Sequence, residues 1–338
     1  MTAETFTPSG AIADLPYKVS NKMLLWFMAV VPFCTALTVI DHFFFGNVMR
    51  EAMNLHMLDI INITAILTFP HIIASLVSFA DREYREYYRK PLIGGICVSL
   101  SLAIGSDILF GGRAILVVVA FYSIYHNIMQ QFGLSAIMLR QKPTPTYNLM
   151  KWTMVIPTWL AYGILSFPFI PELEQHQDVF MQFVGACLVV ATVLAGVFYY
   201  RINQKHTVPR LGLAYFGSNL ILMYVSYGMI VFGYGSMAIL LGRVLHDLSA
   251  YWIYMVHDQN RNNTTLHNPV YKLPRKFGIK PLYVLIPLAV LVSSFLLVLE
   301  EFVDVMAIIV SAFNMMHYYI ESYTWKRGTP HRQHVPFV

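Results

Sequence analysis

Charged residues are scarce in this sequence. Lysine, arginine, aspartate and glutamate together make up 12% of the 338 residues, about half the share that soluble globular domains usually carry. Hydrophobic residues make up 57%, more than a soluble domain can enclose in its core. The composition therefore excludes a soluble globular protein and predicts a polytopic membrane protein.

Cysteine is also rare, and a basic patch is missing. Cys34, Cys97 and Cys187 lie in apolar segments without regular spacing. An odd number of unevenly spaced cysteines argues against a disulfide framework and against a thiolate metal site. The net charge of +5 comes from residues in the loops between apolar segments, where membrane proteins collect lysine and arginine. We therefore expect no nucleic-acid partner.

Ten apolar stretches are long enough to cross a bilayer as helices, which takes about 20 residues each. They cover residues 22–46, 57–80, 91–111, 113–140, 148–169, 178–200, 211–234, 237–258, 280–299 and 303–325. Two junctions, Gly111–Gly112 and Gly233–Gly235, are so brief that each is either a tight outer turn or a break within a longer helix. The sequence thus predicts an all-α fold, a polytopic transmembrane helix bundle of about ten spans.

The basic residues test this count independently, because lysine and arginine concentrate on the cytoplasmic connections of a membrane protein. They fall on alternate connections, and the remaining connections hold only Arg50 and Arg113. We therefore expect both termini in the cytoplasm, in a multi-pass protein of the plasma (inner) membrane. Residues 1–338 form a single integral-membrane domain in this interpretation, with cytoplasmic tails at 1–21 and 326–338 and the helix bundle at 22–325.

Four histidines stand out, because ionisable residues inside membrane spans are rare and usually face a protein interior. His71, His126, His246 and His317 lie on four different predicted helices. Counted from the outer end of its span, each lies roughly nine to fourteen residues deep, at about 1.5 Å per residue. A single buried histidine is most simply satisfied by a neighbouring carbonyl or hydroxyl group. Four at one depth instead predict a metal site, because imidazole is the commonest metal ligand.

Two further side chains share a helix face with these histidines, since residues four apart are neighbours on a helix. Glu321 follows His317 at this spacing, and Gln130 follows His126. We expect Glu321 to be a carboxylate ligand or a catalytic base. We expect Gln130 and Asn314 to support the ligands, with Gln130 also a candidate for catalysis.

Asp247 points about 100° away from its neighbour His246 on a helix. We therefore expect Asp247 to pair with Arg243 and to act in catalysis beside the metal, rather than to share a metal with His246. His42 lies about ten residues nearer the outer surface than the main layer, at about 1.5 Å per residue. It is a metal ligand only if the first helix is tilted or broken, for instance at Pro32.

Nitrogen and carboxylate ligands without thiolates suit iron, manganese, zinc or copper. A site of mostly histidine with one or two carboxylates suits oxygen-activating, non-haem iron best, as one ion or two. Zinc stays open as an alternative, and so does a haem held by two facing histidines.

A second set of polar residues lies at the cytoplasmic ends of the helices. His257 and Asp258 end the eighth span, and His331 and His334 follow in the C-terminal tail. The simplest interpretation is a set of solvated interfacial histidines near anionic headgroups. The alternative is that they close the cytoplasmic mouth of the metal site or receive an electron donor, which is a candidate partner at this face.

Histidine-rich helices in a compact bundle without an extramembrane domain give the chain a class-level resemblance to a known group. It resembles the histidine-rich integral-membrane non-haem iron oxygenases of the Brp/Blh carotene-cleaving type, on His71, His126, His246 and His317. The resemblance implies non-haem iron held by histidines, and dioxygen used on a long apolar substrate. The H-x-x-H-H and H-x-x-x-H patterns of membrane desaturases and hydroxylases are absent, which argues against a desaturase.

The sequence therefore favours an integral-membrane, metal-dependent oxidoreductase, a non-haem iron oxygenase acting on a lipophilic substrate that enters from the bilayer. A metal activates oxygen species that side chains alone cannot. Lipids or lipophilic small molecules are the expected partners. One alternative is a proton- or metal-coupled transporter using the same residues, although transporters commonly show internal repeats, which this sequence lacks. A haem- or quinone-binding redox protein is another.

Overall fold

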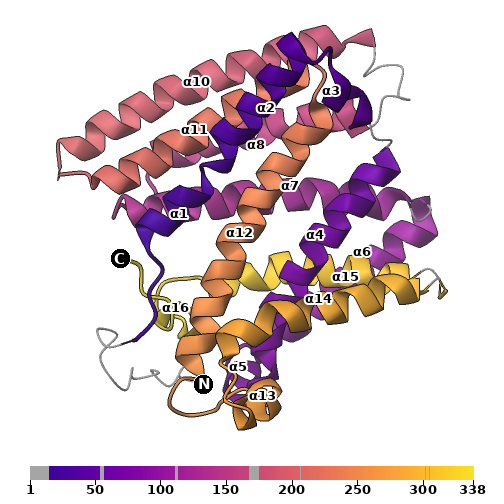
Figure 1. Cartoon of the computed structure of the whole chain (residues 1–338), viewed down its shortest axis with the longest axis vertical. Coiled ribbons are helices and arrows are strands. Elements are labelled where there is room, and N and C mark those ends of the chain that lie inside the picture. The colour runs from indigo at the N-terminus through magenta and orange to yellow at the C-terminus, as the bar shows by residue number, and fades with distance from the viewer. Residues whose placement is uncertain are drawn as a thin grey trace.

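The computed structural model describes residues 15–53, 57–110, 113–166, 175–205, 207–300, 302–303 and 305–338. In these residues the regular structure is helical, apart from one isolated parallel bridge between Val19 and Phe337. The α-helices, labelled in Figure 1, are α1 (Asn21–Phe27), α2 (Val30–Phe44), α3 (Val48–Ala52), α4 (Met57–Val77), α5 (Arg82–Tyr87), α6 (Arg89–Phe110), α7 (Arg113–Met138), α8 (Pro145–Ser166), α10 (Gln177–Asn203), α11 (Arg210–Val231), α12 (Gly235–Arg261), α13 (Lys272–Lys276), α14 (Pro281–Glu300), α15 (Val305–Thr324) and α16 (Pro330–Gln333). Two short 3-10 helices, η2 (Ser78–Ala80) and η3 (Pro269–Tyr271), complete the set.

The all-α prediction is confirmed for the described residues, and each predicted span falls on one long helix, except the first, which covers α1 and α2. Among the described residues, four helices are long and apolar enough to cross a membrane by length and composition. These are the stretch Asn21–Phe44, α10, α11 and α14. The chain is therefore a helical protein with helices suited to a membrane.

The first span is broken one turn before Pro32. Proline has no N–H to donate to the carbonyl four residues earlier, which here belongs to Met28. That carbonyl accepts from the N–H of Val31 instead, at 3.0 Å. The chain consequently leaves α1 at Phe27 and re-enters a helix at Val30. The break suggested at Pro32 thus exists. It lies about four residues earlier, at Met28 and Ala29, because the hydrogen bond that proline cannot make would end at Met28.

The helices form two packed groups joined by α12. In the upper part of Figure 1, α8, α10 and α11 pack together with α7 around a core that includes Met150, Ala191 and Phe216. In the lower part, α14 packs on α4 and α15 packs on α6. Helix α12 runs diagonally between the groups and contacts α11, α4 and α14. Side chains of α12 therefore contact helices of both groups.

Helix α12 is the central element of the bundle because its polar residues are buried along nearly its whole length. Its buried residues include Arg243, His246 and Asp247 in the middle and His257 and Asp258 near the end. Buried polar groups need hydrogen-bond or ionic partners, so the helices around α12 supply them at two levels. These two levels are the candidate metal centre and a second histidine cluster, both described below.

Of the two brief glycine junctions, the structure describes Gly233–Gly235. Gly233, between α11 and α12, has φ +83°, a left-handed conformation that glycine adopts without steric cost. The Gly233–Gly235 junction is therefore a tight turn rather than a break in one helix. Gly111–Gly112 lies outside the described residues, between α6 and α7.

The two ends of the described chain pair with each other. The N–H of Val19 donates to the carbonyl of Pro336 at 2.8 Å, and the N–H of Val338 donates to the carbonyl of Val19 at 3.0 Å. The N–H of Asn21 donates to Val338 at 2.7 Å. Residues 19–21 and 336–338 therefore lie side by side.

Gly212 lies where two helices approach each other closely. A Cβ added to Gly212 in α11 would lie 2.3 Å from the backbone oxygen of Met138 at the end of α7. Small residues allow such backbone contact between membrane helices. We expect Gly212→Ala to destabilise the protein by about 1–3 kcal/mol, since the obstructing atoms are backbone and cannot rotate away.

Thermal unfolding in detergent measures this effect. Gly217→Ala, also in α11, is the matched control, because no atom lies within 4 Å of the added Cβ. Alanine favours the helix over glycine, so Gly217→Ala leaves the melting temperature unchanged or raises it. Equal melting temperatures for the two variants would contradict the close contact.

Candidate metal centre

Four histidines from four helices meet in the middle of the bundle. The ring centroids of His71 (α4) and His317 (α15) are 4.7 Å apart, and those of His317 and His126 (α7) are 5.2 Å apart. His126 and His246 (α12) are 5.0 Å apart, as are His246 and His71. The four imidazoles thus form a closed ring, and they are the four that the sequence placed at one depth. His71, His246 and His317 are fully buried.

Carboxylates complete two overlapping groups of ligand atoms that lie within 4.8 Å of one another. The first group is His71, His126, His317 and Glu321, and the second is His71, His246 and Asp247. His71 belongs to both. The donor set is therefore imidazole nitrogen and carboxylate oxygen without thiolate, which suits iron, manganese, zinc or copper.

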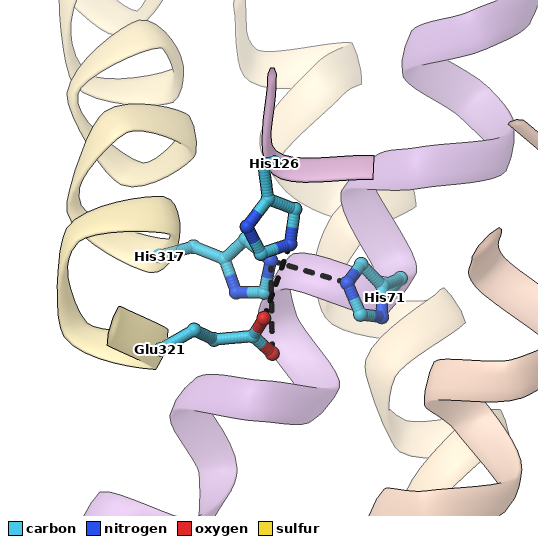
Figure 2. A group of neighbouring side chains, drawn as sticks. All are labelled: His71, His126, His317 and Glu321. Atoms are coloured by element: carbon cyan, nitrogen blue, oxygen red, sulfur yellow. Dashed lines mark hydrogen bonds and ion pairs between the residues drawn. The ribbon is translucent and has the colours of Figure 1, made fainter. Parts of the chain in front are cut away.

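The first group has the spacing of ligands around one small ion (Figure 2). His71 Nε2 lies 3.1 Å from His317 Nε2, and His126 Nε2 lies 3.1 Å from Glu321 Oε2. Glu321 Oε1 lies 4.0 Å from His317 Nε2. Two ligand atoms that are each 2.0–2.1 Å from a metal ion and at right angles are about 3 Å apart. The residues present therefore fit a metal ion between them.

Ser75 fixes the orientation of His317. The Ser75 hydroxyl lies 2.7 Å from the carbonyl oxygen of Ile72, which can only accept, so the hydroxyl donates there. His317 Nδ1, 2.6 Å from Ser75 Oγ, must then carry the proton and donate it. The Nε2 lone pair of His317 consequently faces His71 and Glu321. A second hydrogen bond of this kind sets the tautomer of most metal-binding histidines.

We expect Ser75→Ala to weaken metal binding by about 10–100-fold, the usual cost of losing such an orienting partner. Titration of the metal-depleted protein with ferrous iron measures the change. Ser78→Ala is the matched control, since the Ser78 hydroxyl contacts His331, which is not a ligand of this centre. Equal metal affinities in the two variants would show that Ser75 does not orient a ligand.

The second group has polar atoms without hydrogen-bond partners. Among the described residues, neither ring nitrogen of His246 and neither carboxylate oxygen of Asp247 makes a hydrogen bond, although all four atoms are buried. Asp247 Oδ2 lies 3.6 Å from Arg243 Nε, and Oδ1 lies 4.0 Å from His246 Nε2. The expected pairing with Arg243 is present, but Asp247 also comes within reach of an ion beside His246 and His71. Unsatisfied buried atoms of this kind are costly, and a bound ion would satisfy them.

Of the other predicted site residues, His42 belongs to neither group of ligand atoms among the described residues. His42 lies near the turn between α2 and α3, with Nδ1 3.0 Å from Asn47 Oδ1 and its ring against Phe232. Gln130 has a buried Oε1 without a hydrogen-bond partner among the described residues. Asn314 donates to the carbonyl of Val310 at 2.9 Å and lines a neighbouring cavity.

The inner-surface histidines form a second cluster, which we call the tail cluster: His257, His331, His334, Tyr84 and Asp258. His257 and His331 stack with centroids 4.7 Å apart and an interplanar angle of 5°. Both are buried, so the interpretation as solvated histidines near headgroups is wrong. The reason is that the tail folds back over the end of α12, where Tyr84 contacts His257 at 3.0 Å and His334 at 3.3 Å. His206, which the sequence also places at the cytoplasmic end of a predicted span, lies outside the described residues.

The tail cluster predicts a pH dependence. Burial and the neighbouring His257 hold the pKa of His331 well below its usual value, and burial lowers the pKa of His334 to about 4. An exposed histidine has a pKa of about 6.5, so the released tail binds protons that the docked tail excludes. Docking is therefore strongest above pH 6.5 and weakens as the pH falls toward about 4.

Limited proteolysis across this pH range, with mass spectrometry of residues 326–338, measures tail release. Cleavage should increase as the pH falls. In the His331→Phe, His334→Gln variant this dependence should flatten. Cleavage that is independent of pH in the wild-type protein would contradict the prediction.

A cavity of about 740 Å³ adjoins the metal centre. Its lining is mostly apolar and comes from α4, α7, α8, α10, α11, α12, α14 and α15. Tyr318 lines it and packs on His126 and His317, with centroids 4.6 Å and 5.2 Å apart. Ile66, also in the lining, is 62% exposed. The cavity therefore reaches Tyr318 beside the histidines, and its volume suits a small organic ligand.

Sequence reasoning missed the role of Ser75 and the composition of the tail cluster. Ser75 stands four residues after His71, the spacing that places two side chains on one helix face, and this signal could have identified it. Tyr84 has no such signal, because its partners come from residues 257 and 334.

No protein family model, curated protein or solved structure matches this chain. The functional interpretation therefore depends on the residues of the site.

Proposed function

We propose that the protein is an integral-membrane, metal-dependent oxidoreductase, a non-haem iron oxygenase that acts on a lipophilic substrate. The observation that carries the proposal is the ring of four buried histidines with Glu321 and Asp247 within ligand distance. Ionisable groups gathered in the interior of a membrane bundle mark a functional site. The adjoining apolar cavity supports a lipophilic substrate.

The proposal includes the membrane topology. All ten predicted spans cross the plasma (inner) membrane, and both termini face the cytoplasm. The pairing of residues 19–21 with residues 336–338 supports an even number of crossings. The alternation of basic connections supports the cytoplasmic side for these ends.

Each side chain has a defined task in this proposal. His71, His126, His246 and His317 hold one iron ion or two, together with Glu321 and Asp247. Iron bound there supplies the activation of dioxygen. Ser75 orients His317, the apolar cavity excludes water, and Glu321, 3.1 Å from His126, is placed to accept a proton. Gln130 and Asn314 remain candidates for support of the substrate or ligands.

A transporter is the second candidate, favoured by the buried ion pair of Arg243 and Asp247, because such pairs within spans often serve ion or proton pathways. A haem between His71 and His317 is disfavoured. Axial nitrogens on opposite sides of one iron, each about 2.0 Å from it, would be about 4 Å apart, but these lie 3.1 Å apart.

Elemental analysis and a visible spectrum of the detergent-purified protein test the proposal. We expect bound iron, between about half an equivalent and two, and no Soret band. Absence of bound transition metal would overturn the proposal. A Soret band would favour a haem protein. Uptake of protons or metal ions into proteoliposomes would favour a transporter if Glu321→Gln abolished it.

A further inference from the structure

Arg243 is a buried cation in the wall of the apolar cavity. Its side chain is 7% exposed, and it lines the cavity together with Thr68, Ser123 and Asn127. Its Nε donates to the hydroxyl of Thr68, and its Nη1 donates to the hydroxyl of Ser123 and, at 3.5 Å, to Asn127 Oδ1. These three acceptors are neutral. They position the guanidinium without balancing its charge.

The carboxylate of Asp247 lies near Arg243, but its two oxygens face different partners. Its Oδ2 is 3.6 Å from Arg243, a distance that leaves no hydrogen bond between them, and its Oδ1 is directed to the histidine ring. When Asp247 binds a metal ion, as in the proposed function on which this inference rests, its charge is shared with that ion. The guanidinium then lacks a matching anion, and an unpaired charge in an apolar interior is strongly unfavourable.

The polar end of the cavity is rich in hydrogen-bond donors. The hydroxyl of Ser123 accepts from Arg243, so its own proton is available to a ligand. The lining adds the hydroxyl of Tyr318. A carboxylate accepts hydrogen bonds only, and it pairs with guanidinium in a bidentate manner. An alcohol or an amine would match this set of donors less well.

The cavity also has an extensive apolar lining. Along α11 the lining runs from Asn219 to Ile230, a rise of about 16 Å at 1.5 Å per residue. Leu188, Leu222 and Ile239 contribute to this lining. An extended hydrocarbon chain can lie there with its polar end at Arg243.

We infer that the cavity binds an apolar chain that ends in a carboxylate, with the carboxylate at Arg243 beside the histidine ring. The substrate class of the proposed centre is therefore the long-chain carboxylic acids. Binding at Arg243 places the polar end of the chain next to Tyr318, and Tyr318 packs directly on His126 and His317. The carbons nearest the carboxylate consequently lie closest to the metal ligands.

Binding of the fluorescent fatty acid parinarate to the purified, iron-loaded protein tests the inference. We expect saturable binding, and displacement by laurate about tenfold or more better than by dodecanol or dodecylamine, which corresponds to about 1.4 kcal/mol. Arg243→Gln should weaken laurate binding by a similar factor. Arg275→Gln is the matched control, since Arg275 is exposed on the inner surface and contacts the carbonyl of Thr264.

Ala120→Phe provides an independent variant, because it fills the cavity without changing Arg243, and it should abolish parinarate binding. Equal displacement by laurate and dodecanol, or unchanged binding in both Arg243→Gln and Ala120→Phe, would overturn the inference. Iron content is measured in each sample. Iron without selective laurate binding refutes the inference alone, whereas Arg243-dependent laurate binding without any metal refutes the proposed function alone.

Discussion

Replacing His317 by alanine is expected to remove most of the bound metal. His317 contributes Nε2 3.1 Å from that of His71 and 4.0 Å from Glu321 Oε1, so it lies at the middle of the first group of ligands. Loss of an orienting partner alone weakens metal binding by about 10–100-fold. Loss of a ligand at the middle should weaken it by more than about a hundredfold. Metal content after gel filtration, measured by elemental analysis, should fall close to background.

His42→Ala is the matched control for this variant. It removes an imidazole from the same bundle, but His42 contacts Asn47 and Phe232 near the turn between α2 and α3. Its metal content should equal that of the wild-type protein. Circular dichroism checks that both variants keep their helices. An unchanged metal content in His317→Ala would exclude His317 as a ligand.

Replacing Arg261 by alanine is expected to cause the largest loss of stability. Arg261, at the end of α12, binds Asp81 at 2.8 Å and Glu83 at 2.5 Å, and its guanidinium lies 4.8 Å from the ring centre of Tyr84. The hydrogen bond to Arg261 also holds the pKa of Glu83 below its usual value. Removing one partner of a buried ion pair costs about 3–5 kcal/mol, because the other charge stays buried. Asp81 is the charge left behind, at 2% exposure.

Thermal unfolding in detergent measures this loss, and Arg82→Ala is the control. Arg82 pairs with Glu86 at 2.7 Å on the same helix, but both side chains are exposed, and exposed pairs contribute about 0–1 kcal/mol. A double variant, Arg261→Met with Asp81→Asn, removes the buried charge as well and should recover part of the stability. A melting temperature of Arg261→Ala equal to that of Arg82→Ala would contradict the importance of the buried pair.

The sequence predicted the helices and the height of each histidine, because both depend on local pattern. Apolar runs give the helices, and counting along a run gives the depth of His71 or His317 at 1.5 Å per residue. Counting along one helix cannot give the direction in which another helix approaches it. For this reason the reach of Asp247 toward His71 could not be foreseen from its angle relative to His246.

The sequence pattern also failed to predict contacts between residues that are distant in sequence. His257 is buried because His331 returns from the tail to stack on it, and no periodicity within α12 carries that information. His42 illustrates the opposite case. The break that it required is present near Pro32, yet the side chain stays near the turn between α2 and α3, against Asn47.

The bridge between Val19 and Phe337 has a consequence for synthesis. Val19 leaves the ribosome long before Phe337 is made, so the residues before α1 meet this partner only after the helices between them have been synthesised. Contacts between residues so far apart in sequence form late. The tail residues His331 and His334 belong to the same final segment and cover His257 at the same time. Docking of residues 331–338 on both the start of α1 and the end of α12 therefore follows synthesis of the helices between them, and a translation arrest before residue 331 leaves both sites open.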